Sequence, residues 1–278
     1  MSAQLVSILL PNHRTPELTC LCLRLLHKHT PAQLARVIVV DNASDEVSLT
    51  YLRSLDWITL LERNIDADSD PAQSHARALD LALSQVTTPY VCSIHTDTLI
   101  KRGDWLDYLL NQIRGKSNCA GVGSWKLDTR AQRWQWILSV EQVLQRHFPR
   151  LKGRRTLLRE QRHETGRYLR SHCALYRTDL IRRYQLSFVD NGISSTGRCL
   201  HQSLVTQGHR MVFLPEQDMS FYLEHLNHAT ILLNPRLHRQ VQYGVAHPLQ
   251  MYRRQRRMRK KLLAFGAEEV LNDDSLDR

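Results

Sequence analysis

Three polar side chains in the first hundred residues each follow a short apolar run. They are Asn12, Asp41 and Asp97, and the last is reached through the polar step His95-Thr96. Such runs are typical of buried strands, and in open α/β sheets ligands bind beyond the carboxyl ends of the strands. We therefore predict that two carboxylates and an amide share one edge of a sheet, where they can hold a ligand.

The basic residues suggest what kind of ligand or surface the chain meets. The formal net charge is +11 and the pI is near 9.7. Residues 146–183 hold twelve Lys or Arg and three acids, and residues 253–261 (RRQRRMRKK) hold seven basic residues and no acid. Such clusters attract nucleotide phosphates, anionic lipids or nucleic acid. A merely solvated helix face remains the alternative for both clusters.

The elements that must position these residues alternate between strand and helix up to about residue 125. We expect strands at 5–10, 37–40, 58–61, 90–94 and 119–122. Helices are expected after Thr15-Pro16-Glu17, after Asp70-Pro71 and over 105–114, the first two with a cap and a proline at the first helical position. This alternation predicts a doubly wound, mostly parallel sheet.

The pattern weakens after residue 125. We expect a strand within 168–176, a helix over 198–207, a strand at 211–214 and a basic helical tail from about residue 235. Trp134 and Trp136 lie in this half and are candidates for stacking on a ligand, although simple packing is favoured.

Composition is that of an ordinary globular protein, with 42% hydrophobic and 23% charged residues. The first residues lack a basic region before their apolar run, and no stretch approaches 18 apolar residues, so neither a signal peptide nor a membrane span is expected. The six cysteines include no C-x-x-C pair. We expect a reduced, cytoplasmic protein.

Four segments together resemble the family 2 glycosyltransferases, which are inverting sugar transferases of the GT-A fold. The segments are VSILLPNHRTPELTCLCLRLL, VIVVDNASD, SHARALDLALSQVTTPYVCSIHTDTLIKRGDWLDYLL and, more weakly, LHQSLVTQGHRMVFLP followed by His225. The resemblance implies a GT-A domain over residues 1–230, with a nucleotide-sugar half (1–125) and a less regular acceptor half (126–230). Residues 231–278 would form a basic helical extension.

The resemblance also implies roles for particular residues. Asp41 would accept hydrogen bonds from the nucleoside of a nucleotide-sugar donor, although an Asx-turn is an alternative for it. Asp97 would hold Mn²⁺ or Mg²⁺ against the donor diphosphate, with His225 as a second ligand. The nucleotide-binding candidates are Pro11, Asn12, Asp41, Arg77, His95 and Thr96.

Two departures from the family pattern concern the chemistry. His95 stands where the family carries the first acid of its Asp-x-Asp motif. An imidazole there would either hydrogen-bond the ribose or a phosphate or shift metal preference toward Mn²⁺, with an ordinary loop histidine as the alternative. The positions of the usual catalytic acids hold Thr196 and Gly197. An inverting transferase needs a base for the acceptor hydroxyl, and Asp190 is our candidate, with Asp218 as a weaker one and a simple turn as the alternative.

Three functions follow as hypotheses. The first is sugar transfer to a cell-surface or lipid-linked glycan, with the chain peripheral on the cytoplasmic face of an anionic membrane, where Leu262, Leu263 and Phe265 join the basic run. The second is glycosylation of modified bases in DNA, which predicts steeply salt-dependent duplex binding. The third is an inactive GT-A domain that binds glycans or nucleotides, which donor turnover would exclude.

Overall fold

The computed structural model describes residues 4–64, 70–125, 167–189, 196–227, 229, 233 and 248–278. Strands within these ranges are β1 (Val6–Asn12), β2 (Ala35–Asn42), β3 (Ile58–Arg63), β4 (Tyr90–Ile94), β5 (Thr98–Ile100), β6 (Cys119–Gly123), β7 (Cys173–Arg177), β8 (Arg210–Phe213) and β9 (Leu223–His225). Helices are α1 (Pro16–His29), α2 (Glu46–Arg53), α3 (Pro71–Ser84), α4 (Trp105–Arg114), α7 (Thr178–Arg183), α8 (Arg198–Thr206), α9 (Glu216–Tyr222), α12 (Pro248–Ala264), α13 (Ala267–Leu271) and the 3₁₀ helix η2 (Asp274–Asp277).

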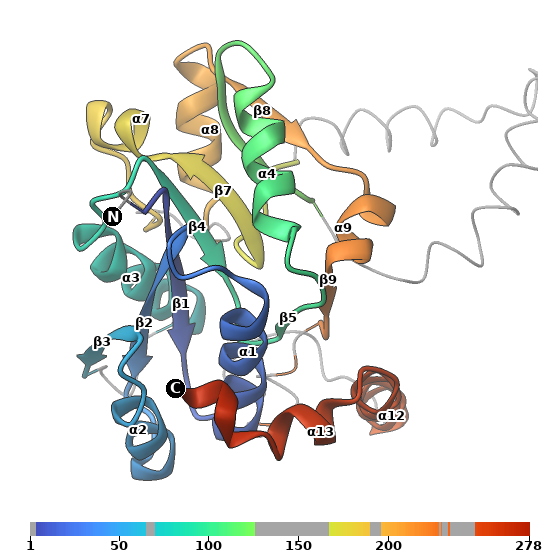
Figure 1. The fold of residues 1–278 in the computed structure, drawn as a ribbon. Helices are drawn as coiled ribbons and strands as arrows, with labels where there is room; N and C mark the ends of the chain where they lie inside the picture. The colour runs from blue at the N-terminus through green and yellow to red at the C-terminus, as the bar shows by residue number, and fades with distance from the viewer. Residues whose placement is uncertain are drawn as a thin grey trace, which may run out of the picture.

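Seven of the strands form one sheet in the order β3-β2-β1-β4-β7-β6-β8 (Figure 1). Every neighbouring pair is parallel except those of β7, which runs antiparallel to both β4 and β6. The α/β class and the mostly parallel sheet predicted from the sequence are therefore confirmed. The antiparallel β7 was not foreseen, since a strand signal carries no direction.

Helices cover both faces of this sheet. On one face, α1 and α4 pack through residues such as Leu21, Leu25 and Leu106. On the other, α3 and α8 pack through residues such as Leu79 and Leu200. Strands β1, β2 and β4 are buried between these layers, which explains why they are continuous apolar runs rather than alternating ones.

Of the two helix caps predicted from the sequence, the structure contains one. Asp70 caps α3, because its side chain accepts a hydrogen bond from the Gln73 backbone N–H at 3.2 Å. Helix α1 begins at Pro16 as expected, but Thr15 makes no side-chain cap. The Thr15 hydroxyl instead lies 3.4 Å from that of Thr19, so the expectation of a Thr15 cap is wrong.

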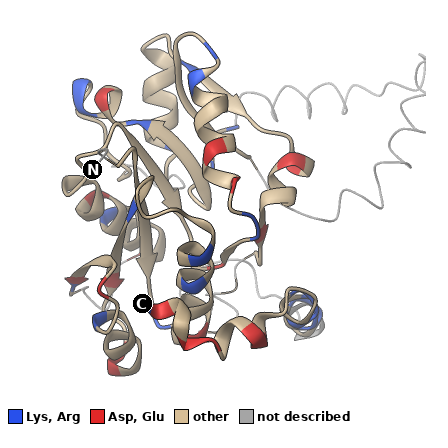
Figure 2. Ribbon diagram, viewed as in Figure 1, with Lys and Arg blue, Asp and Glu red and all other residues tan. Residues whose placement is uncertain are grey.

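The C-terminal elements return to the body of the molecule beside α1. The side chain of Arg24 on α1 is buried and binds Asp274 and Asp277 as well as the backbone carbonyls of Val270 and Leu271. Lys and Arg side chains gather on α12, which Figure 2 shows as a predominantly basic helix at the edge of the fold. Among the residues described, no helix is both long and apolar enough to cross a bilayer.

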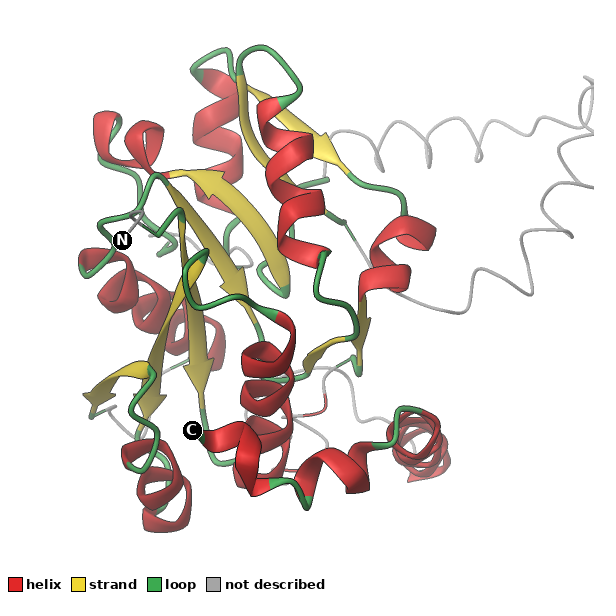
Figure 3. Cartoon of the chain, in the orientation of Figure 1, coloured by secondary structure: helices red, strands yellow, loops and turns green. Residues whose placement is uncertain are grey.

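A second, two-stranded sheet joins β5 and β9 (Figure 3). The strands are antiparallel, and Thr98 faces His225 across the ladder. This short pairing brings a residue near the end of the expected catalytic domain next to the residues that follow β4. It is the element that assembles the site described next.

Candidate functional site

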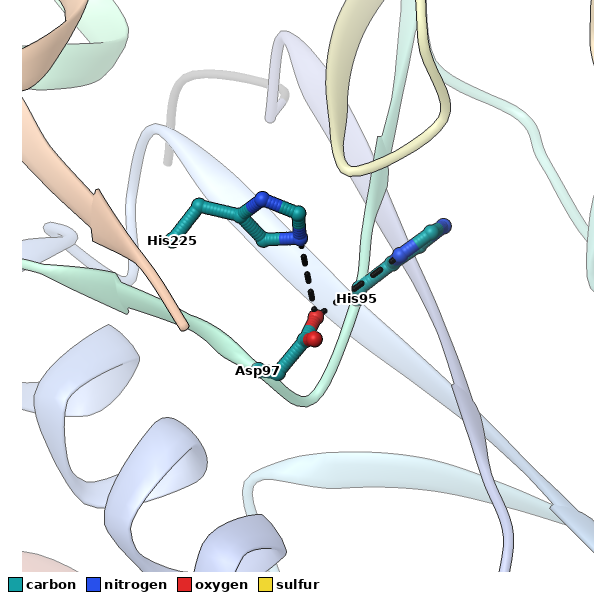
Figure 4. Close-up of side chains that lie close together, drawn as sticks. All are labelled: His95, Asp97 and His225. Atoms are coloured by element: carbon teal, nitrogen blue, oxygen red, sulfur yellow. Dashed lines mark ion pairs between the residues drawn. The ribbon is translucent and has the colours of Figure 1, made fainter. Parts of the chain in front are cut away.

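Asp97 lies in the short turn between β4 and β5, at the carboxyl edge of the sheet. Its carboxylate is buried, with 6% of the side chain exposed. One oxygen, Oδ2, accepts a hydrogen bond from the backbone N–H of Ala229 at 3.1 Å. The other, Oδ1, faces two imidazoles, as Figure 4 shows. The backbone thus holds one carboxylate oxygen, while the other faces the two imidazoles.

His95 is the first of these imidazoles. Its Nε2 atom lies 2.9 Å from the hydroxyl of Ser171, and its Nδ1 atom lies 3.8 Å from Asp97 Oδ1. The tautomer with the proton on Nε2 donates to Ser171 and leaves the Nδ1 lone pair on the side of the carboxylate. About a third of this side chain is exposed, so His95 forms the accessible wall of the site.

His225 is the second imidazole and comes from β9. Its Nε2 atom lies 3.2 Å from Asp97 Oδ1. Its Nδ1 atom is buried and has no hydrogen-bond partner among the described residues. The backbone locks this arrangement, because the Leu226 N–H donates to the Asp97 carbonyl at 2.9 Å. The β5–β9 pairing therefore positions His225 beside Asp97.

Two further histidines lie around this set, and neither was predicted from the sequence. His75, at the start of α3, lies edge-on to His95 with ring centroids 4.7 Å apart. His172, just before β7, stacks on His225 with centroids 4.6 Å apart, and its Nε2 atom lies 2.9 Å from Ser124 Oγ. His75 lies two residues from the candidate Arg77, and His172 lies within the segment 168–176 where a strand was expected, so position along the chain was the only available signal.

The electrostatics of the cluster centre on Asp97. Burial alone would raise the pKa of Asp97, but His225, His95 and the Ala229 N–H together hold it below its ordinary value. Burial lowers the pKa of His75 to about 4, although Asp97 opposes this shift. Burial, His225 and His95 lower the pKa of His172. The carboxylate is therefore ionised at neutral pH, while His75 and His172 are neutral.

A second polar pair lies at the ends of β1 and β2. Asn12 and Asp41 are directly opposite each other in the parallel ladder, and the Asn12 amide donates to Asp41 Oδ1 at 2.8 Å. Asp41 Oδ2 accepts from the backbone N–H of Ser44 at 2.9 Å, which is the turn contact that the sequence left open as an alternative. Both side chains are buried, and Pro11 is buried within β1 before them.

Helix α1 connects the two polar positions from one side. Thr19 donates its hydroxyl to Asn12 Oδ1 at 2.6 Å. Cys22, one turn later, directs its thiol to the carbonyl of Thr98 at 3.3 Å and to that of His95 at 3.7 Å. Residues three apart share a helix face, so one turn of α1 contacts both polar positions.

The start of α3 makes a second connection. Arg63, at the end of β3, donates to Asn42 Oδ1 at 2.8 Å and to the Ser74 carbonyl at 3.3 Å. The next residue after Ser74 is His75, which contacts His95. Arg63 was not among the sequence candidates, yet its guanidinium lies beside the residue that follows Asp41.

The remaining candidates are placed less distinctively. Thr96 is buried between His95 and Asp97. The side chain of Arg77 is exposed on α3, and no contact joins it to the other candidates within the described part of the chain. Asp190 lies outside the described residues, as do Trp134 and Trp136, so their suggested roles stay predictions.

The three side chains around Asp97 Oδ1 fit a divalent metal ion. One ligand atom from each of His95, Asp97 and His225 lies within 4.8 Å of the others. Two imidazole nitrogens and one carboxylate oxygen are ligands that first-row divalent ions accept. The orientation of His95 by Ser171 resembles the outer hydrogen bonds that commonly fix metal-binding histidines.

Comparisons with known proteins agree with this architecture. The family model described as Glycosyl transferase family 2 matches residues 7–185. The structure of mannosyltransferase PcManGT from Pyrobaculum calidifontis, in complex with GDP-Man and Mn²⁺, has a TM-score of 0.56 and 16% identity, covering 97% of this chain and 70% of that one. Residues 1–349 of S. aureus TarS have a TM-score of 0.51 and 13% identity, with coverage of 94% and 72%.

No curated protein sequence matches the chain. The structural likenesses at this level of identity concern the fold, and they confirm the GT-A type expected from the sequence. The family match spans well over half of the chain and includes β1 to β7, with both the Asp41 and the Asp97 turns. The chain therefore belongs to the family 2 glycosyltransferases.

Proposed function

We propose that this chain transfers a sugar from a nucleotide-diphosphate donor to an acceptor hydroxyl with inversion, and that a divalent cation held at Asp97 assists the reaction. The observation that supports this most strongly is the convergence of His95, Asp97 and His225 at the carboxyl edge of the sheet. The likeness to a mannosyltransferase in complex with GDP-Man and Mn²⁺ supports it independently.

In this proposal, the two polar positions bind different parts of the donor. Asp41, oriented by Asn12 and Ser44, offers carboxylate oxygens to an N–H of the base or a ribose hydroxyl. His95, Asp97 and His225 would hold the cation, which when bound neutralises charge that builds on the departing diphosphate. The helix α1 and α3 contacts fix the spacing between the two positions.

The transfer itself needs a base. The acceptor oxygen forms a bond to the anomeric carbon, the bond from that carbon to the diphosphate oxygen breaks, and the hydroxyl proton passes to a carboxylate. Asp190 is our candidate for this carboxylate. Its described flanks both attach to α3: Asp80 accepts from the Val189 N–H at 3.1 Å, and Thr196 donates to the Ala72 carbonyl at 3.2 Å. Helix α3 also carries His75, beside the cation ligands.

The ligand set favours Mn²⁺ over Mg²⁺ in this proposal. Mg²⁺ is bound mainly by carboxylates, phosphates and water, whereas imidazole nitrogen suits first-row transition metals. A site with His95 in place of an acid therefore loses affinity for Mg²⁺ more than for Mn²⁺. Asp97 remains the only carboxylate among the three ligands.

A thermal-shift panel of nucleotide sugars tests the proposal, with each donor measured with and without Mn²⁺. GDP-mannose is the first donor to try, because a structural relative binds it. A ligand at about a hundred times its Kd stabilises the native state by about 2.7 kcal/mol. For a chain of this size that corresponds to a rise in Tm of about 5–10 °C.

The variant Asp97→Asn removes the charge and keeps the shape of the side chain. We expect it to abolish the Mn²⁺-dependent rise in Tm and the turnover of the same donor. The matched control is Asp107→Asn on α4, an exposed acid, which should behave as the wild type. Asp190→Asn should retain donor binding and lose transfer if Asp190 is the base. Failure of every donor to bind the wild type, or equal binding by Asp97→Asn, would contradict the proposal.

A further inference from the structure

Helix α12 presents an unusual surface for an element at the edge of a folded domain. From Tyr252 to Ala264 it contains seven Lys or Arg and no acid. Six of these cationic side chains are exposed: Arg253, Arg254, Arg256, Arg257, Arg259 and Lys260. Figure 2 shows α12 as the largely blue helix at the lower right. Such a density of like charge repels itself unless an anionic partner is present.

One side of α12 faces the protein. Met258 is 7% exposed and belongs to the hydrophobic core, and Leu262 and Phe265 are partly buried against the same core. Lys261 forms an ion pair with Glu224. At 100° per residue these positions lie on one side of the helix or just past its end. Two of the three apolar residues that the sequence assigned to a surface anchor, Leu262 and Phe265, therefore pack inward instead.

The opposite side exposes two large apolar residues among the cations. Tyr252 is 62% exposed and Leu263 is 76% exposed. They are eleven residues apart, which places them on nearly the same line along the helix, about 20° apart. Arg256, Arg259 and Lys260 flank this line. A basic face with an apolar line is the pattern of helices that lie in a lipid interface.

We propose that this outer face of α12 binds an anionic phospholipid surface. Tyr252 and Leu263 enter the headgroup region, and the flanking Arg and Lys side chains contact the lipid phosphates. An anionic lipid surface accounts for both the charge and the apolar line. A nucleic-acid backbone would account for the charge alone and would leave Leu263 without a partner.

The same helix is attached to the candidate active site. Lys261 Nζ donates a hydrogen bond to the backbone carbonyl of His225 at 3.0 Å, in addition to its pair with Glu224. Both residues belong to β9, which positions His225 beside Asp97. A surface bound by α12 is therefore mechanically connected to the strand that builds the cation site. This connection favours a hydroxyl of a lipid-linked glycan as the acceptor, an inference that rests on the proposed function.

Vesicle sedimentation with the full chain tests the lipid contact. We compare phosphatidylcholine vesicles with vesicles in which about one lipid in four is phosphatidylglycerol. Binding is expected only with phosphatidylglycerol and should weaken as salt is added. Each basic residue near an anionic surface strengthens binding about fivefold. The triple variant Arg253→Gln, Arg256→Gln, Lys260→Gln should therefore bind about a hundredfold more weakly.

The matched control removes the same charge elsewhere, through Lys116→Gln, Arg183→Gln and Arg210→Gln. These exposed residues follow α4, end α7 and begin β8, at the opposite end of the fold from α12 (Figure 1). The control should retain vesicle binding. A second test, Tyr252→Ser with Leu263→Ser, keeps every charge and should remove the part of binding that survives high salt.

Several results would overturn the inference. These are the absence of binding to phosphatidylglycerol vesicles, an equal loss in both triple variants, and tighter binding of duplex DNA or RNA than of vesicles. Donor turnover in solution is measured in parallel for each variant. Absence of vesicle binding by a wild type that turns over a donor would contradict this inference alone. Vesicle binding without any donor turnover would contradict only the proposed function.

Discussion

Arg24 is the residue on which the attachment of the C-terminal segment depends. Its guanidinium is 4% exposed and lies between α1 and the α13–η2 segment. It donates to Asp277 Oδ1 at 2.9 Å, to Asp274 Oδ1 at 2.6 Å, and to the carbonyls of Leu271 and Val270 at 2.7 and 3.1 Å. We predict that Arg24→Met, which keeps the apolar stem and removes the guanidinium, strongly destabilises this segment.

The size of the loss in stability depends on the carboxylates that Arg24→Met leaves without their counter-charge. Breaking a buried ion pair costs about 3–5 kcal/mol, because the remaining partner stays buried without its counter-charge. Asp274 is 89% exposed and is easily rehydrated, whereas Asp277 is only 22% exposed and retains the hydroxyl of Tyr51 as a partner. We therefore expect Arg24→Met to lower the free energy of unfolding by about 3 kcal/mol, the lower end of this range. For a chain of this size that lowers Tm by about 6–12 °C.

Thermal unfolding followed by circular dichroism measures the loss, and hydrogen exchange locates it. The backbone amides of α13 should exchange faster in Arg24→Met, while those of β1 and β2 should keep their order of protection. The matched control is Arg53→Met, whose guanidinium binds Glu62 and Glu46 at the surface. It should change Tm little, since exposed ion pairs contribute little. A loss as small as that of the control, or exchange that quickens uniformly over the sheet, would refute the reasoning.

Two further predictions concern histidines. His95→Asp should bring the stabilisation by donor with Mg²⁺ close to that with Mn²⁺, because a second carboxylate suits the harder ion; an unchanged ratio of the two Tm rises would count against His95 as a ligand. His201 is buried, accepts from the Leu169 N–H at 3.2 Å, and has a pKa lowered by burial to about 4 from 6.5. The contribution of neutral His201 to the free energy of unfolding is thus complete above pH 6.5 and is lost as the pH falls toward 4. Between pH 7 and 4, the free energy of unfolding measured in urea should therefore fall by on the order of 2 kcal/mol more in the wild type than in His201→Asn. Parallel pH curves for the two proteins would contradict this.

The first half of the fold was predictable because its central strands β1, β2 and β4 are covered on both faces. Strands of that kind are largely apolar, and β2 and β4 are short apolar runs that end in polar turns. The Asn12 and Asp41 pairing follows from this, since parallel neighbours bring their carboxyl ends to one edge. The position of Asp97 after β4 follows for the same reason.

The second half of the fold was less predictable, because it depends on long-range contacts that leave no local signal in the sequence. Strands β5 and β9 have three residues each, too short for a periodicity, and their pairing joins positions more than a hundred residues apart. His225 could be named from the family resemblance, but no pattern in the sequence indicated that it would face Thr98. Arg24 is a similar case, because an arginine within an apolar stretch of a helix does not identify its partners.

The charge of the site gives the substitution at position 95 a physical meaning. Among His95, Asp97 and His225, the only negative charge belongs to Asp97, and the nearby His75 and His172 are neutral at pH 7 because burial lowers their pKa values. A site with two acids would place one more negative charge beside a donor diphosphate. The imidazole of His95 avoids that repulsion while its Nδ1 atom still faces the shared position. Replacing an acid by histidine therefore leaves a cation ligand in place and makes the site more attractive to an anionic donor, which is why we interpret this departure as compatible with activity.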